Sequence, residues 1–177
     1  VLTNSLASTD VLAVHAGYSA YRPALLAAGI ELHEYRPDAQ RPAPKGHIMR
    51  AGRSESALHA KVIVYDQRIV WIGSANSDPR SRRINTEAGL LIESEVLAER
   101  LLKGLERDFS PQHSWRLTLE PEGHAGAKRI VWIGELDGKL ARLHEEPGGG
   151  FLRALSLLLY SIMPNIDSVR LVNSGTE

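Results

Sequence analysis

A histidine and a lysine separated by one residue carry the clearest chemistry in this sequence. His59 and Lys61 fall in a β-rich run, and side chains two residues apart share one face of a strand. Ala60, Val62 and Val64 are then expected to face a core. An imidazole can transfer a proton near neutral pH, whereas a lysine ammonium holds a phosphate oxygen as a fixed positive charge. The pair therefore predicts a site for phosphate chemistry.

Polar residues that follow the next β-rich run add to this site. Ser74 and Asn76 lie in the stretch Gly73-Ser74-Ala75-Asn76, and Glu87 follows after a polar loop. If the two runs pair, Ser74 and Asn76 return to the same edge as His59. Neutral donors and a cation around the non-bridging oxygens, with an imidazole in line with a bridging oxygen, are what the cleavage of a phosphodiester needs.

The elements that must position these residues are a hairpin and the strand after it. Leu58–Tyr65 and Arg68–Ile72 are β-rich runs joined by Asp66-Gln67, which predicts a hairpin, and Thr86–Ile92 predicts a further strand. Elsewhere the pattern predicts a helix over 11–26 capped by Ser8, Thr9 or Asp10 and ended by Gly29, a strand over 30–35, a helix capped by Ser94, strands over 115–119, 129–135 and 140–144, and a last helix over 151–163. Pro23 predicts a kink or a restart in the first helix.

The composition is that of one globular domain. The chain has 177 residues, a formal net charge of +0, 43% hydrophobic residues and no cysteine, which excludes disulfides, thiolate metal sites and cysteine nucleophiles. Alternating strands and helices predict an α/β fold with one mixed sheet flanked by helices on both faces. The apolar run over 151–163 is too short to span about 30 Å of hydrocarbon. It is expected to be a helix that is buried or covered by a partner, or one that lies on a bilayer surface.

Positive charge is concentrated in the middle of the chain. Residues 36–83 hold ten basic and four acidic side chains, a net charge of +6 in a neutral protein. The basic residues include Arg41, Lys45, Arg50 and Arg53 in a long loop predicted over 36–56, and Arg80, Arg82 and Arg83 after the second run. Either these residues line an anion site, with the three arginines contacting a substrate headgroup, or they are solvated loop residues.

The spacing His59-x-Lys61-x4-Asp66-x6-Gly73-Ser74-x-Asn76 resembles the signature of the phospholipase D superfamily at every position. Glu87 resembles the acidic residue that follows that signature. The lead-in over residues 3–37, including Thr3-Asn4-Ser5, is similar to the segment before the second signature of bacterial cardiolipin synthases. The resemblance covers roughly residues 1–160. It implies a C-terminal catalytic half-domain over 1–163, with the signature at 58–87, and a tail over 164–177 for which disorder is one expectation.

The resemblance implies a mechanism that the spacing does not show. Members of this superfamily build one active site from two signatures, and one histidine attacks phosphorus to form a phosphohistidine while the other serves as acid and base. By similarity, His59 is the acid and base, Lys61 and Asn76 bind phosphate with support from Ser74, and Glu87 orients a facing histidine. Asp66 belongs to the catalytic signature, although its usual role is structural pairing away from the phosphate. Neither a metal nor another cofactor is implied.

Only one signature is present, because none of the other six histidines has a lysine two residues later: His15, His33, His47, His113, His124 and His144. The active site therefore needs a missing N-terminal half or a second copy of the chain. The leading interpretation is a membrane-associated phosphatidyltransferase or phospholipase on the cytoplasmic or inner-membrane face. Its substrate is expected to be phosphatidylglycerol or phosphatidylethanolamine. The chain shows no signal peptide or transmembrane span, and it reads as a piece of a longer protein.

Two other interpretations stay open. A homodimeric one-signature phosphodiesterase or endonuclease would use the basic loop to follow a nucleic-acid backbone. The neutral net charge and the aromatic content of 6% disfavour nucleic acid as a partner. A non-catalytic domain that binds a phospholipid headgroup or a partner protein would keep the phosphate contacts without turnover.

Overall fold

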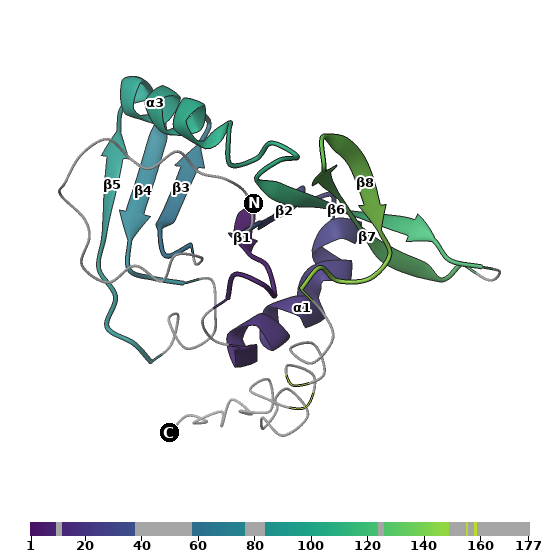
Figure 1. The fold of residues 1–177 in the computed structure, drawn as a ribbon. Coiled ribbons are helices and arrows are strands. Elements are labelled where there is room, and N and C mark those ends of the chain that lie inside the picture. Colours follow the sequence, from purple (N-terminus) through teal and green to yellow (C-terminus); the bar gives the residue numbers. More distant parts are fainter. Residues whose placement is uncertain are drawn as a thin grey trace, which may run out of the picture.

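The chain forms an α/β fold whose strands belong to two separately hydrogen-bonded sheets (Figure 1). The computed structural model describes residues 1–9, 12–37, 58–76, 84–123 and 126–148, together with Leu155 and Leu158. The five-stranded sheet has the order β1 (Leu2–Asn4), β2 (Leu32–Tyr35), β6 (Ser114–Pro121), β7 (Lys128–Leu136) and β8 (Lys139–Leu143). The three-stranded sheet has the order β3 (Lys61–Tyr65), β4 (Ile69–Gly73) and β5 (Gly89–Glu93).

Helix α1 (Leu12–Ala27) connects β1 to β2, which pair in parallel. Parallel neighbours need such a crossover, because the chain must return to the end of the sheet at which the first strand began. Pro23 lies inside α1, and the helix continues through it instead of restarting there. Gly29 has a φ of 82°, the left-handed conformation that favours glycine after a helix. The predicted helix and its predicted end are therefore confirmed.

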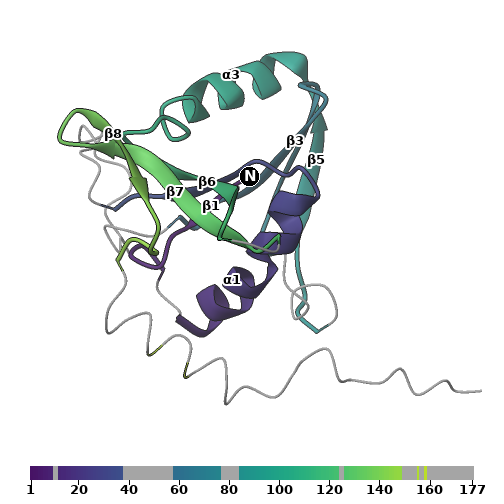
Figure 2. The ribbon, with the colours of Figure 1, turned by 90° about the vertical axis from the view of Figure 1, so that its right-hand side faces the viewer.

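The core of the five-stranded sheet combines apolar side chains with buried charges. Leu32, Trp115, Leu117 and Trp132 form the buried cluster, and Leu25 and Leu26 of α1 pack against it. Figure 2 shows α1 lying along this sheet and away from the second described helix, α3 (Glu95–Leu105).

One arginine links the charged groups of this core. The Arg22 guanidinium, 3% exposed, lies 2.7 Å from Glu34 Oε1 and 2.5 Å from Glu146 Oε1. Glu34 is fully buried and also accepts hydrogen bonds from Tyr18 and from the Trp132 indole, at 3.1 and 3.0 Å. Every oxygen of Glu34 thus has a donor, which offsets the cost of burying its charge.

The two carboxyl groups beside Arg22 shift in opposite directions. Burial raises the pKa of Glu34 above its ordinary value, and the charge of Arg22 opposes the rise only in part. Burial also acts to raise the pKa of Glu146, but hydrogen bonds from His15 and Arg22 outweigh it and hold that pKa at about 2. Glu146 therefore stays ionised in the folded protein at any pH near neutrality.

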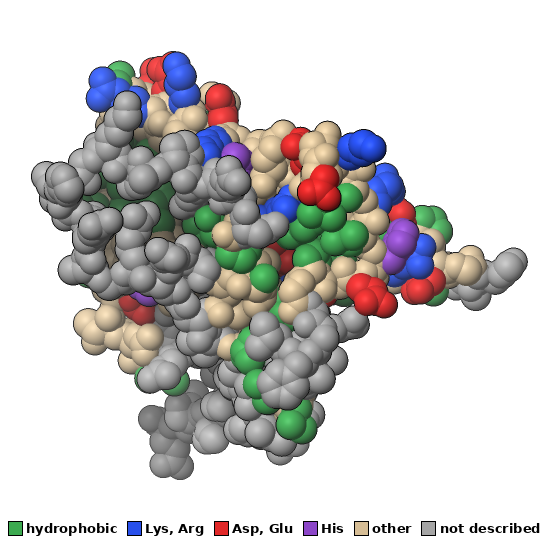
Figure 3. All heavy atoms as spheres, in the orientation of Figure 1, with side chains coloured by type: hydrophobic (Ala, Val, Ile, Leu, Met, Phe, Trp, Pro, Cys, Tyr) green, Lys and Arg blue, Asp and Glu red, His purple; other side chains and the backbone are tan. Residues whose placement is uncertain are grey.

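The three-stranded sheet contains the predicted hairpin. β3 and β4 pair in antiparallel register, and the turn between them has positive φ at Asp66 and Gln67, 50° and 55°. Ser94 caps α3 as expected, since its side chain accepts a hydrogen bond from the Leu97 amide. Acidic and basic side chains cover the outer surface of α3 (Figure 3). The strands predicted over 115–119, 129–135 and 140–144 are confirmed as β6, β7 and β8.

The prediction of one sheet is wrong for the part of the chain that the structure describes. Each described helix packs against a different sheet, α1 against β6 and α3 against β4, so coverage of one sheet on both faces stays a prediction. Among the described residues, the Asn4 side chain connects β1 to the segment entering β3, and no backbone ladder joins the two sheets. The expected core face of β3 also needs correction, since Ala60 precedes the strand and is exposed, whereas Val62 and Val64 are half-buried.

Several predicted features lie outside the described residues. These are the Asp10 cap, the basic loop except for Arg36 and Pro37, the arginines at 80, 82 and 83, and the tail over 164–177. Of the predicted last helix, the structure describes Leu155 and Leu158, both in helical conformation.

Candidate active site

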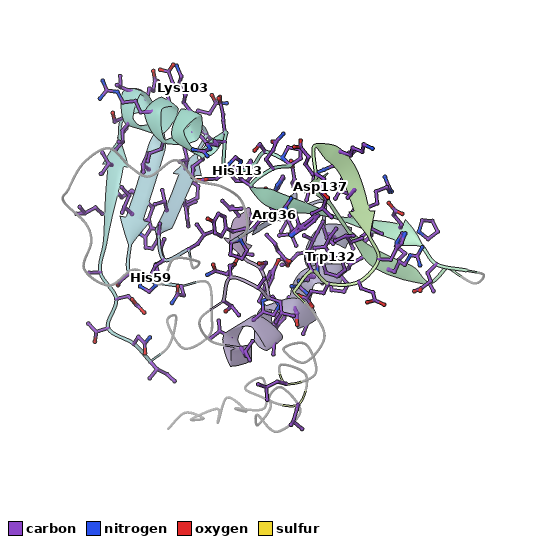
Figure 4. All side chains as sticks on the ribbon, in the orientation of Figure 1. Arg36, His59, Lys103, His113, Trp132 and Asp137 are labelled. Carbon is purple, nitrogen blue, oxygen red and sulfur yellow. The ribbon has the colours of Figure 1, made fainter. Side chains whose placement is uncertain are left out.

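Distant parts of the sequence meet at one end of the three-stranded sheet. Lys61 pairs with Gly73, and Gly73 pairs with Gly89, so the start of β3, the end of β4 and the start of β5 form one row. His59 lies two residues before this row, at the end of the sheet away from α3 (Figure 4). An open hollow of about 550 Å³ lies here, lined by His59, Lys61, Ile72, Gly73, Ser74, Ala88, Gly89 and Leu90. The structure therefore brings His59, Lys61 and Ser74 to one place.

Lys61 contacts the backbone of the histidine residue. Its Nζ donates a hydrogen bond to the carbonyl oxygen of His59 at 2.9 Å. An ammonium has three N–H donors, so this bond leaves it able to hold a phosphate oxygen as well. The His59 side chain is exposed, and the structure shows no hydrogen bond from its imidazole to any residue it describes. An accessible imidazole thus stands beside a fixed positive charge.

Ser74 and Glu87 are joined across the end of the sheet. The Ser74 hydroxyl donates to Glu87 Oε2 at 2.5 Å and accepts from the Ala88 amide at 3.0 Å. The Ser74 amide in turn donates to the Ala88 carbonyl at 2.9 Å, and Asn85 donates to Glu87 Oε1 at 3.3 Å. In this arrangement the hydroxyl proton of Ser74 is directed to Glu87. Donation to a phosphate would require that bond to be released.

An aromatic ring explains why two positions at this edge are glycine. A Cβ on Gly73 would lie 2.5 Å from the Trp71 ring and 2.6 Å from the Ala88 carbonyl oxygen. A Cβ on Gly89 would lie 2.7 Å from the Trp71 indole nitrogen. The indole therefore lies across the backbone of both residues. Gly73 belongs to the signature stretch, so the packing of the sheet requires a glycine at that position of the stretch.

The other predicted site residues lie apart from the hollow or outside the described residues. Asp66 is in the hairpin turn at the far end of β3, and a strand of five residues spans about 17 Å. The structure thus separates Asp66 from His59, and no described contact gives it a catalytic role. Asn76 is exposed after β4 and does not line the hollow. The placement of Arg80, Arg82 and Arg83 is not described.

Two asparagines near the site had no assigned role in the sequence interpretation. Asn85, in a bend before β5, contacts Glu87 two residues later, and a loop position carried no pattern that predicted this contact. Asn4 contacts the backbone of Leu58, immediately before His59. Since 54 residues separate Asn4 from Leu58, no local pattern could reveal that contact.

Neither a metal centre nor a membrane-spanning helix is found in the described part of the chain. No group of three or more histidine or acidic side chains is placed to hold a metal ion there. Among the described helices, none has the length and apolar character needed to cross a bilayer. The imidazole of His59, the ammonium of Lys61 and the hydroxyl of Ser74 bonded to Glu87 can together bind an anion and transfer a proton.

Comparison with known proteins identifies the family. The family described as "Cardiolipin synthase, PLD-like domain" matches residues 1–109, which is more than half of the chain. The chain belongs to this family of phospholipase D-like domains. No solved structure matches it.

Individual relatives are similar over most of this chain but are much longer. Cardiolipin synthase C of Escherichia coli (strain K12) is 40% identical over 166 residues, which cover 93% of this chain and 33% of the relative. An uncharacterized protein of Helicobacter pylori (strain J99) is 32% identical over 164 residues, which cover 93% of this chain and 30% of the relative. Cardiolipin synthase A of Pseudomonas aeruginosa (strain LESB58) is 28% identical over 125 residues, which cover 71% of this chain and 21% of the relative. The chain thus spans a third or less of each of these relatives.

Proposed function

We propose that this chain supplies one of the two signatures of a phosphatidyltransferase or phospholipase that resembles cardiolipin synthase. The observation that carries the proposal is the meeting of His59, Lys61 and Ser74 at one open hollow in a member of this family. The name of the relative from Escherichia coli supports a phospholipid substrate. Phosphatidylglycerol or phosphatidylethanolamine is the expected donor.

The proposed reaction is a double displacement at phosphorus. A histidine of the other signature attacks, forming an N–P bond, while the bond from phosphorus to the leaving alcohol oxygen breaks. His59 donates a proton to that oxygen. His59 then takes a proton from the incoming alcohol or water, which attacks phosphorus and breaks the N–P bond. Each histidine thus returns to its starting state.

The other residues bind and orient the phosphate in this proposal. The Lys61 ammonium holds a non-bridging oxygen, and its bond to the His59 carbonyl keeps it beside the imidazole. Asn76 adds a neutral donor when substrate is bound. Ser74 and Glu87 act as a pair, because the hydroxyl of one is bonded to the carboxylate of the other. The exposed state of His59 leaves room for a facing histidine from another half.

The partner is the half that carries the second signature, and the site of action is the membrane surface on the cytoplasmic or inner-membrane face. Light scattering over a range of concentrations separates the two sources of that half. A stable dimer of this chain would favour a one-signature phosphodiesterase built from two copies. A monomer would favour a missing half, as in the much longer relatives.

The decisive experiment is a chimaera in which this chain replaces the matched third of Escherichia coli cardiolipin synthase C. We expect it to make transfer or hydrolysis products from vesicles of phosphatidylglycerol and phosphatidylethanolamine, measured by mass spectrometry. His59→Gln keeps a polar side chain but removes the proton-transfer group, and turnover should fall by about 10²–10⁴-fold. The unaltered relative is the positive control. A folded chimaera that makes neither product, or a His59→Gln variant with full turnover, would contradict the proposal.

A further inference from the structure

The residue that precedes the histidine of the site is held by a side chain from the other sheet. Asn4 is the last residue of β1, and its Oδ1 accepts a hydrogen bond from the Leu58 amide at 2.7 Å. Its Nδ2 donates to the Leu58 carbonyl at 2.9 Å. The side-chain amide thus satisfies both backbone groups of one residue, as a neighbouring strand would. These two bonds also fix which atom of the amide is oxygen and which is nitrogen.

The backbone of His59 lies outside the sheet ladder. The register of β3 with β4 begins at Lys61, so Leu58, His59 and Ala60 have no ladder partner among the described residues. The described bonds that hold this segment are the Asn4 pair and the bond from Lys61 Nζ to the His59 carbonyl. In the proposed function, Lys61 is also the cation that binds the phosphate. Asn4 is therefore the restraint that does not depend on the ligand.

Asn4 is itself held by a buried polar cluster. Ser8, 1% exposed, donates to Asn4 Oδ1 at 3.3 Å and accepts from the Ser5 amide at 2.8 Å. The Asn4 backbone pairs with Tyr35 of β2. Because β1, the turn after it and β2 all constrain Asn4, its amide is a fixed point at the edge of the five-stranded sheet. The stretch Thr3-Asn4-Ser5 stood out in the sequence as a lead-in without a role.

We infer that Asn4 is a positioning residue for His59. Asn4 holds Leu58, the residue before the histidine, at the edge of the five-stranded sheet. The inference rests on the proposed function, since it assigns His59 a proton-transfer role. Proton transfer requires the imidazole within about 3 Å of the reacting oxygen, and a displacement of about 1 Å can lower the rate about 10²-fold. Loss of Asn4 should thus lower kcat and leave KM little changed, because Lys61 still binds the phosphate.

The activity test compares three variants in the chimaera. Asn4→Ala removes both bonds and should lower kcat by about 10–10²-fold, with KM within about twofold. Asn4→Asp keeps the acceptor for the Leu58 amide but places a charge against the Leu58 carbonyl, and it should not restore the rate. Thr3→Ala on the same strand is the matched control and should leave kcat unchanged. Equal kcat losses in Thr3→Ala and Asn4→Ala would overturn the inference, because a weakened β1 would then explain both.

A second measurement reads the position of His59 without turnover. The imidazole carbons of the full chain are followed by ¹H–¹³C NMR, with the buried His33 on β2 as the internal reference for the five-stranded sheet. Asn4→Ala should shift or broaden the His59 signal and leave that of His33 in place. An unchanged His59 signal would overturn the inference, as would an equal change at both histidines.

The two proposals fail in different ways. If His59→Gln abolishes turnover while Asn4→Ala stays within twofold of the unaltered chimaera, the positioning role is wrong and the proposed function stands. If His59→Gln keeps its turnover, the proposed function is wrong, and the NMR measurement still decides whether Asn4 positions His59.

Discussion

The two sheets of this protein use polar side chains in opposite ways. Beside the five-stranded sheet, the buried Arg22 pairs with the buried Glu34 and with the largely buried Glu146. In the three-stranded sheet, His59 is exposed and Lys61 contacts a backbone carbonyl beside an open hollow. Charges of the first kind pair with one another inside the fold, so they contribute to its stability. Groups of the second kind remain accessible to a ligand, so they can do chemistry.

This contrast also explains why the connection between the sheets matters. The charged groups beside the five-stranded sheet are enclosed by the fold, whereas the site occupies the open end of a three-stranded sheet. Asn4 joins the two sheets through its two hydrogen bonds to the backbone of Leu58, the residue before His59. Removing a charge of the enclosed cluster should therefore change the free energy of unfolding, and removing the accessible histidine should change turnover.

Replacing Arg22 should give the largest change in stability. Arg22→Ala leaves Glu34 and Glu146 without their shared cation, and removing one partner of a buried ion pair costs about 3–5 kcal/mol. Urea unfolding followed by circular dichroism measures the loss. Arg22→Lys keeps the charge but loses the planar guanidinium, so its free energy of unfolding should lie between those of the wild type and Arg22→Ala. A loss under about 1 kcal/mol in Arg22→Ala would show that this cluster does not hold the fold.

A methyl group at Gly73 should give the next largest change. In Gly73→Ala the new Cβ meets the Trp71 ring and the Ala88 carbonyl at 2.5 and 2.6 Å, and overpacking of this kind costs about 1–3 kcal/mol. The hydrogen bonds between Ser74 and Ala88 should weaken with it. Gly17→Ala is the matched control, since a Cβ there meets nothing within 4 Å in helix α1, and it should stabilise by about 0.5–1 kcal/mol.

The stability of the five-stranded sheet should depend on pH through Glu146. Its pKa of about 2 in the folded protein lies below the ordinary value of 4.5, so its contribution is complete above pH 4.5 and is lost as the pH falls toward 2. The part lost between pH 7 and pH 3 is about 2 kcal/mol. The raised pKa of Glu34 has the opposite effect on the free energy of unfolding, because its contribution is lost as the pH rises.

Urea unfolding of the wild type and of Glu146→Gln at both pH values isolates this contribution. The stability difference between the two proteins should shrink at pH 3. A difference that stays constant would mean that Glu146 is not the group responsible.

The sequence predicted the parts of the fold that depend on residues close together in the chain, but not those that depend on residues far apart. The hairpin, the Ser94 cap and the β6–β7–β8 strands follow from local periodicity and turn residues, and all were predicted. The family followed from six residue types at fixed spacing. The separation into two sheets was not predicted, because it depends on which strands pair across long stretches of the chain, and local patterns do not show that.

The candidate site was predictable to the same extent. That His59 and Lys61 meet Ser74 follows from pairing β3 with β4, which local patterns predict. That Asp66 lies at the far end of the strand follows from the same pairing, because the residue in the turn of a hairpin is the one most distant from its open end. The engagement of Ser74 with Glu87 could not be predicted, since it requires the return of the chain after a loop.

The smallest expected change in stability belongs to the residue with the largest expected effect on turnover. The His59 side chain is exposed and has no hydrogen bond to the described residues, so His59→Gln removes little buried area and no hydrogen bond within that part of the chain. Surface substitutions of this kind change the free energy of unfolding by at most about 0.5 kcal/mol. Urea unfolding of the full chain checks this value. A stability loss near that of Arg22→Ala would break the division between the two sheets, because His59 would then be held by the fold and would not be free for a substrate.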